Sequence, residues 1–290
     1  MKTGHVKLKV HARPFCKVMR NLTKRALKGY FWHVIHNRKE EQSEKATTWL
    51  LRLKHKGLIK PFQNLKRFDH DIPIDRHFVL RLFRPVRRMA RFNEGLPIDR
   101  YYIDGFLLSH RQDIGGHVLE IGDDTYARRF GGERVDKCDV LHVTDGNPQA
   151  TIIADLSCTN DIPSDTFDCI ILTQTLQYIY DVQAAIHTLH RILKPGGVLL
   201  ASLPGIAHIS RYDMDHWGEY WRFTTMSARR LFESVFPSDT VEVHQYGNML
   251  TAIAFLLGLA SEELRENELN YCSPDFQLLL TVRAAKPRAQ

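Results

Sequence analysis

The stretch FDCIILTQTLQYIYDVQAAIHTLHRILKPGGVLLASLP, residues 167–204, decides the fold of this chain. It opens with the apolar run 167–173 and closes with a second apolar run, 198–203. Between the two runs, residues 181–193 carry their apolar side chains on one stripe at helical spacing. We expect LKPGG to stop this helix, because proline cannot continue the hydrogen-bond ladder and glycine supplies the turn. A strand, a helix and a second strand in this order predict a parallel βαβ unit.

Short apolar runs lie on both sides of this unit and alternate with helical patterns. We expect helices at 97–113, 124–131 and 225–236. This alternation predicts a doubly wound α/β fold, with a largely parallel sheet covered by helices on both faces. The remaining strand candidates are HVLEIG (117–122), DVLHV (139–143), TIIADL (151–156), VEVHQY (241–246) and FQLLLTVRA (276–284).

The charge of the chain divides it into two parts. Residues 1–100 carry a net charge of +17, whereas residues 101–290 carry −10. The sequence pattern also changes at about Pro97, where apolar runs begin to alternate with helical patterns. We therefore expect a basic, mostly helical N-terminal extension over 1–95 and an α/β domain over 96–290.

The basic extension has three competing interpretations. Residues 12–36 and 40–56 have the pattern of basic amphipathic helices, and 58–95 that of an irregular linker with short helices. The apolar faces could cover the α/β domain as a lid or substrate domain, which we favour. Contact with an anionic membrane surface or a glycan partner ranks next. Nucleic acid is the least favoured partner, because no RNA-binding module accompanies the charge.

Several features favour a cytoplasmic protein. The five cysteines are scattered without metal-ligand spacing, which favours a reducing compartment and no structural metal. The N-terminus lacks the continuous apolar region of a signal peptide. The stretch Met249–Ala260 is too short to span a membrane, which takes about 20 residues. We expect it to form a helix buried against the body or against a second copy in a homodimer.

Candidate ligand-binding residues follow the predicted strands. In a doubly wound sheet, ligands bind beyond the carboxyl ends of the strands. Gly122 follows the first strand and would let the backbone approach a ligand closely, or it could simply turn the chain. Asp145 lies 23 residues further on, near the spacing of about 20 at which an acid reaches ribose hydroxyls. Asp155 follows the third strand and Gln174 the fourth, although Asp155 could instead cap a turn and Gln174 satisfy backbone groups.

Four blocks of this sequence resemble the class I S-adenosylmethionine-dependent methyltransferase family. They are HVLEIGDD, the TIIADL acid, FDCIILTQTLQYIYD and RILKPGGVLLASLP, and the resemblance covers about 97–285. It implies a Rossmann-like seven-stranded sheet with the last strand antiparallel, and S-adenosylmethionine as cofactor. By position, the resemblance assigns Glu120 and Gly122 to the methionine end, Asp145 to ribose, Asp155 and Leu156 to adenine, and Thr173 and Gln174 to the sulfonium. Asp123, which follows Gly122, is a further candidate for cofactor binding.

The sequence departs from the family pattern in two places. Only Gly122 remains of the three glycines in the first motif. A catalytically inactive scaffold or regulatory subunit is therefore an alternative to an active enzyme. The second and third strands are also so close that the usual helix between them must be missing or reduced to one turn. This leaves His142 as a competitor of Asp145 for the ribose contact.

The segment 208–224 combines acids, histidines and five aromatic residues after the fifth strand. It is where acceptor specificity is expected, although its aromatic residues could merely pin the loop to the core. Histidines titrate near pH 6.5 and suit general-base catalysis, so we predict His216 as the base, assisted by Asp213 or Asp215. These features favour metal-free methyl transfer to a hydroxyl or amine. Similarity to members with aromatic loops of this kind implies a small-molecule or glycan-type acceptor, and the basic extension leaves an RNA methyltransferase as an alternative.

Overall fold

The computed structural model describes residues 95–288 of the chain. The basic helices expected at 12–36 and 40–56, and all but the last residue of the linker at 58–95, lie outside these residues. The predicted domain boundary therefore stays a prediction.

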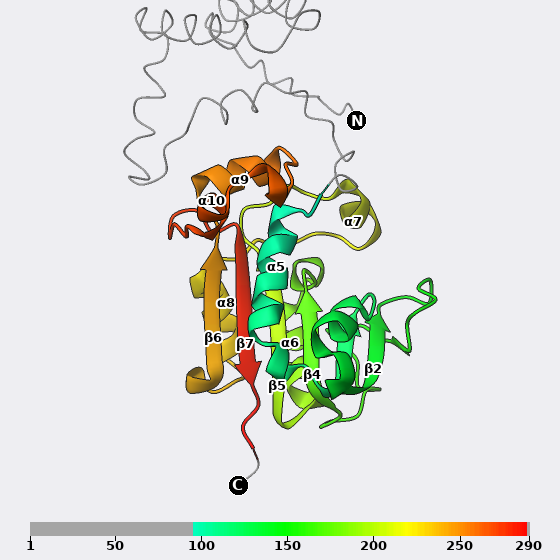
Figure 1. Cartoon of the computed structure of the whole chain (residues 1–290). Coiled ribbons are helices and arrows are strands. Elements are labelled where there is room, and N and C mark those ends of the chain that lie inside the picture. Colours follow the sequence, from blue (N-terminus) through cyan, green and yellow to red (C-terminus); the bar gives the residue numbers. More distant parts are fainter. Residues whose placement is uncertain (1–94, 289–290) are drawn as a thin grey trace, which may run out of the picture. The chain divides into compact units, whose positions relative to one another are not determined.

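One seven-stranded sheet forms the centre of the described region (Figure 1). Its strands are β1 (Gly116–Ile121), β2 (Val135–His142), β3 (Ile152–Ile153), β4 (Phe167–Thr173), β5 (Leu193–Pro204), β6 (Val241–Tyr246) and β7 (Leu279–Ala285). They are arranged in the order β3-β2-β1-β4-β5-β7-β6, and β7 runs antiparallel to both of its neighbours. Each of the seven predicted apolar runs overlaps one strand, so the predicted sheet with its last strand antiparallel is confirmed.

Helices pack on both faces of the sheet, which confirms the doubly wound arrangement. Ile170 and Leu172 of β4 belong to one buried cluster, which includes side chains of α6 and α8. Cys169 and Ile171, which alternate with them along β4, belong to a second buried cluster that includes side chains of α5 and α9. The two sets separate because successive side chains of a strand point to opposite faces. The helices are α5 (Ile98–Ser109), α6 (Val182–Ile192), α7 (Arg211–His216), α8 (Thr225–Glu233), α9 (Met249–Leu256) and α10 (Glu266–Asn270).

The βαβ unit forms as expected, except at the start of its second strand. The side chain of Asp181 caps the first turn of α6, and the helix ends at Ile192. However, β5 begins at Leu193 and not at Val198, so the turn predicted at 194–197 is wrong. These four residues form a bulge within β5, which pairs with β4 on both sides of it. Gly196 has a φ of +86°, a backbone conformation that favours glycine and permits the bulge.

Four predicted helices are shorter than expected, and one of them is the helix predicted at 225–236, where α8 ends at Glu233. The helix expected at 97–113 stops after α5 and is followed by the short turn η2 (Arg111–Asp113). In place of a helix over 124–131 there is one helical turn, η3 (Ala127–Gly131). Helix α9 ends before Gly258, whose φ of +70° turns the chain. It packs against α5 and α10 of the same chain, as predicted, while a contact with a second copy stays a prediction.

The segment between β2 and β3 contains no helix, as the short spacing predicted. Separately, no helix within residues 95–288 has both the length and the apolar character needed to cross a membrane. The predicted cytoplasmic location is untested.

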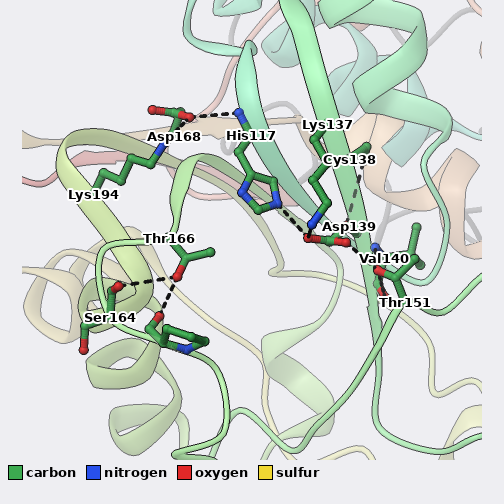
Figure 2. Close-up of polar contacts among 11 residues, drawn as sticks. His117, Lys137, Cys138, Asp139, Val140, Thr151, Ser164, Thr166, Asp168 and Lys194 are labelled. Carbon is green, nitrogen blue, oxygen red and sulfur yellow. Dashed lines mark hydrogen bonds and ion pairs between the residues drawn. The ribbon is translucent and has the colours of Figure 1, made fainter.

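A polar network ties the strands together away from their carboxyl ends (Figure 2). The Asp139 carboxylate accepts hydrogen bonds from His117 at 2.6 Å, Lys137 at 2.7 Å and Thr151 at 2.9 Å. The backbone N–H of His117 donates to Asp168 at 2.8 Å. Burial alone would raise the pKa of Asp139, but its three hydrogen bonds outweigh burial and hold the pKa below its usual range. The network therefore links β1, β2 and β4 to the segment that precedes β3.

Strands β1 to β5 are parallel, so their carboxyl ends meet at one edge of the sheet. Residues 205–224 connect β5 to α8, include α7, and are called the strap below. In Figure 1, α7 lies at the edge to which the arrows of β2 and β4 point. The predicted ligand-binding loops and the strap thus belong to the same edge.

Candidate active site

The loop after β1 is held by Glu120. Its carboxylate is buried and accepts hydrogen bonds from the backbone N–H groups of Tyr126 at 3.1 Å and Ala127 at 2.7 Å. Burial raises the pKa of Glu120 to about 7, although the two backbone hydrogen bonds oppose this shift. Glu120 therefore shapes the loop, and its predicted contact with the cofactor stays a prediction.

Gly122 provides space for a ligand at this loop. Its φ is +89°, and a Cβ added there would meet no atom within 4 Å. The side chain of the next residue, Asp123, accepts a hydrogen bond from the backbone N–H of Thr125 at 2.9 Å. The sequence analysis predicted that a ligand approaches the backbone closely at Gly122, and the open space beside this residue is compatible with that role.

The loop after β2 lies against the loop after β1. Asn147 makes this contact by donating a side-chain hydrogen bond to the carbonyl of Gly122. His142 is the last residue of β2, and its Nδ1 lies 2.8 Å from the carbonyl oxygen of Thr144. Asp145 is exposed in the turn that follows. Of the two candidates for the ribose contact, His142 thus occupies the strand end, and sequence reasoning missed Asn147 altogether.

The residues after β3 have local partners. The Asp155 side chain accepts hydrogen bonds from the backbone N–H of Ser157 at 2.8 Å and from its hydroxyl at 2.7 Å. This is the turn-capping contact that the sequence offered as the alternative for Asp155. Leu156 is buried in the core beneath the loop. Contact of either residue with adenine stays a prediction.

The residues after β4 turn sharply around Gln174. Its φ is +47°, and its backbone N–H donates to the carbonyl of Ser202 at 3.0 Å. Thr173, the last residue of β4, accepts a hydrogen bond at its carbonyl from the hydroxyl of Thr175. Gln177 is buried and donates to the Gln174 carbonyl at 2.9 Å, so the side chain of Gln177 satisfies a backbone group at this strand end.

The strap is attached to the ends of several strands. Its last part returns to β5, where the backbone N–H of Phe223 donates to the carbonyl of Pro204 at 2.9 Å. The Trp221 indole donates to the carbonyl of Ile179 at 3.0 Å, so this aromatic residue does pin the loop. Phe223 is buried in the core. At the far side of the strap, the Trp217 ring contacts His142 edge-on, with the ring centroids 5.5 Å apart.

Helix α7 carries the three predicted catalytic residues, and each of them contacts a different partner. Asp215 pairs with Arg211 at 2.8 Å within the helix. Asp213 accepts a hydrogen bond from the Tyr178 hydroxyl at 3.1 Å. His216 is exposed and directs Nδ1 to the carbonyl of the residue one helical turn earlier, at 2.6 Å. Both carboxylates thus have partners other than His216 in this structure, and their assistance to His216 in catalysis stays a prediction.

Burial and the nearby Asp213 carboxylate raise the pKa of Tyr178 to about 12, so its hydroxyl remains a donor near neutral pH. Tyr178 belongs to η5 (Leu176–Tyr178), the short turn after β4. The sequence had assigned no role to this residue. It anchors α7 to the end of β4.

The first turn of α5 also contributes charged groups that sequence reasoning missed. The Arg100 guanidinium lies 3.4 Å from the Tyr126 hydroxyl in the loop after β1. Asp99 is 3.9 Å from Arg100, and burial raises the pKa of Asp99 despite this neighbour. The sequence predicted that a helix begins at Pro97, but it did not predict that the N-terminal end of this helix lies against the loop after β1.

No group of three or more His, Cys, Asp and Glu side chains within residues 95–288 is placed to hold a metal ion. The edge of the sheet instead presents backbone groups, one open glycine, scattered charged side chains and the aromatic strap.

Comparison with known proteins identifies a family. The methyltransferase-domain family profile matches residues 98–243. The fold is similar to an S-adenosylmethionine-dependent methyltransferase from Mesorhizobium loti, at 18% identity over 65% of this chain and 98% of that chain, with a TM-score of 0.42. It is also similar to phosphoethanolamine N-methyltransferase 2 from Haemonchus contortus, at 14% identity over 75% and 62% of the two chains, with a TM-score of 0.46.

The [4+2]-cyclase SpnF has the same kind of fold, at 14% identity over 65% of this chain and 82% of that chain, with a TM-score of 0.42. No curated protein matches the sequence. The family profile covers just over half of the chain and includes β1 to β5, the strap and the first half of β6. The chain therefore belongs to the methyltransferase-domain family and is a class I S-adenosylmethionine-dependent methyltransferase.

Proposed function

We propose that this enzyme transfers a methyl group, without a metal, to a hydroxyl of a small-molecule or glycan-type acceptor bound beneath the strap. The observation that carries this proposal is the strap itself. It brings His216 and a group of aromatic side chains to the edge of the sheet where the cofactor loops end.

The residues at this edge fit S-adenosylmethionine. The open space at Gly122 leaves room for a ligand against the backbone, and His142 lies at the end of the neighbouring strand. Arg100 adds a positive charge beside the same loop. When bound, the cofactor supplies a methyl group on a sulfonium, which is an activated donor for in-line displacement. The protein must then align the acceptor and exclude water.

The geometry of His216 supports a role as general base. Its Nδ1 is 2.6 Å from the backbone carbonyl oxygen of Tyr212, and a carbonyl can only accept a hydrogen bond. Nδ1 therefore carries the proton, and in the neutral ring the lone pair lies on Nε2. The acceptor hydroxyl would give its proton to Nε2 while its oxygen bonds to the methyl carbon, and the sulfonium would leave as a neutral thioether.

Three aromatic rings of this region support a sugar or another flat acceptor. Tyr180, Tyr220 and Trp221 have exposed side chains, and their ring centroids lie 5.4 and 5.9 Å apart in two contacts. Exposed aromatic rings with a polar tip offer apolar faces to sugar or planar rings and hydrogen bonds at their edges. Such a surface suits an acceptor that carries both hydroxyls and apolar ring faces.

The test is a methyl-transfer assay with the full chain, S-adenosylmethionine and a panel of sugars, glycans and hydroxylated metabolites, read as release of S-adenosylhomocysteine. With the acceptor identified, His216→Ala should lower turnover about 100- to 10,000-fold. His187→Ala, an exposed histidine on α6, is the matched control and should retain full turnover. A chelator should leave the parent rate unchanged. Transfer to amines only, chelator-sensitive turnover, or near-parental turnover of His216→Ala would contradict the corresponding part of the proposal.

A further inference from the structure

Trp217 connects the strap to the opposite part of the cofactor edge. The strap leaves β5 and returns to it, yet the indole of Trp217 contacts His142 at the end of β2. The two ring planes meet at 85°, so the contact is edge-to-face. In the sheet, β1 and β4 lie between β2 and β5. Trp217 therefore reaches across the ends of two strands.

The position of Trp217 is set by the helix that precedes it. Its backbone N–H closes the last turn of α7 by donating to the carbonyl of Asp213 at 2.7 Å. The side chain of Asp213 is anchored in turn by the Tyr178 hydroxyl after β4. Gly218 follows with a φ of +80°, which turns the chain away. The protein alone already half-buries the indole of Trp217.

The surroundings of His142 have the features of a nucleoside site. The loops after β1 and β2 are joined by the hydrogen bond from Asn147 to the Gly122 carbonyl. The space beside Gly122 is open. In doubly wound sheets, the nucleoside part of a ligand binds where these two loops meet. Trp217 is the strap residue that contacts this corner through His142.

We propose that Trp217 forms part of the binding site for the adenosyl group of the cofactor, so that a residue of the acceptor-binding strap also binds the cofactor. An indole offers a flat apolar face to a purine ring, and such contacts are strong for any aromatic base. The consequence is a coupling between the two ligands, because cofactor bound against Trp217 holds the end of α7 in place. The proposal goes beyond the proposed function, because it concerns the cofactor and not the identity of the acceptor.

The first test measures the affinity of the full chain for two probes by titration calorimetry. S-adenosylhomocysteine contains the adenosyl group and the amino-acid end, whereas 5′-methylthioadenosine lacks the amino-acid end. Trp217→Ala should bind both probes about tenfold more weakly or worse, and Trp217→Phe should keep most of the affinity. Met226→Ala is the control, because Met226 is an exposed apolar residue of α8, outside the strap and the cofactor loops, and this variant should bind both probes like the parent.

The outcomes separate this proposal from the proposed function. Parental affinity of Trp217→Ala for both probes would overturn it, and so would an equal loss of affinity in Met226→Ala. Failure of the parent to bind either probe would also overturn it. Failure to find a hydroxyl acceptor would leave it standing. A second measurement needs no variant: S-adenosylhomocysteine should slow hydrogen exchange of the backbone amides at 213–218 in the parent chain and leave α8 unchanged. Unchanged exchange at 213–218 would also overturn the proposal.

Discussion

Replacing Glu120 with glutamine is expected to remove a pH-dependent part of the stability of this enzyme. Glu120 is 2% exposed, and the pKa of its carboxyl group is about 7 in the folded chain, compared with 4.5 for an ordinary glutamate. The folded chain therefore binds this proton more tightly than the unfolded chain. Stability from this group is complete below about pH 4.5 and is lost as the pH rises through about 7.

The size of the effect follows from the two pKa values. Each pKa unit corresponds to about 1.36 kcal/mol, so the free energy of unfolding of the parent should fall by about 3 kcal/mol over this range because of Glu120 alone. Glutamine cannot ionise, and its side-chain oxygen can accept from only one of the two N–H groups that the carboxylate binds. Glu120→Gln should thus be about 1 kcal/mol less stable than the parent in acid and more stable at about pH 8.

The assay is urea unfolding of the full chain at a series of pH values, with the difference between variant and parent plotted against pH. His110 and His190, whose pKa values burial lowers, gain stability as the pH rises, but they are present in both proteins and cancel in the difference. Glu133→Gln removes an exposed carboxylate from the same segment and should give no such crossing. A constant difference between Glu120→Gln and the parent at all pH values would refute the reasoning.

Two further predictions concern the cofactor loop and the polar network. Gly122→Val should weaken the binding of S-adenosylhomocysteine without unfolding the chain. Gly132→Val is the control, because Gly132 also has a positive φ and open space beside it, and this variant should bind S-adenosylhomocysteine like the parent. Equal affinities of the two variants would contradict the assignment of Gly122 to the cofactor site. Asp139→Asn should lower the free energy of unfolding by about 2–3 kcal/mol near neutral pH, because the three contacts of the carboxylate are weakened. The loss should be smaller in acid, because protonation of Asp139 weakens the same contacts in the parent. An unchanged urea midpoint near neutral pH would contradict this prediction.

The sheet could be predicted from the sequence because its signal is local. Each strand is an apolar run bounded by polar residues, and α6 carries one apolar stripe with Asp181 at its cap. The start of β5 could not be predicted in this way. Proline and glycine usually end a regular element, but here the neighbouring strand resumes pairing beyond them, and Gly196 supplies the required positive φ. The outcome depended on the neighbouring strand, which local sequence does not describe.

The sequence predicted where the candidate site lies in the fold, but not which side chains contact one another within it. Parallel strands bring their carboxyl ends to one edge, so the loops containing Gly122, His142 and Gln174 could be located in advance. The partners of individual side chains could not. Tyr178 meets Asp213 across 35 residues of sequence, and Arg100 meets Tyr126 across 26. Such contacts require the fold, which is why the partners of Asp213 and Asp215 could not be predicted from the sequence.

The hydrogen bond from the Phe223 N–H to the Pro204 carbonyl has a consequence for how new specificities can arise on this scaffold. It brings the two ends of the strap together, so the intervening residues form a closed excursion from the sheet. The free-energy cost of closing such a loop grows only slowly with its length. Insertions, deletions or exchanged segments between Pro204 and Phe223 can therefore change the surface of the strap while β5 and α8 keep their places, which makes this junction suitable for grafting.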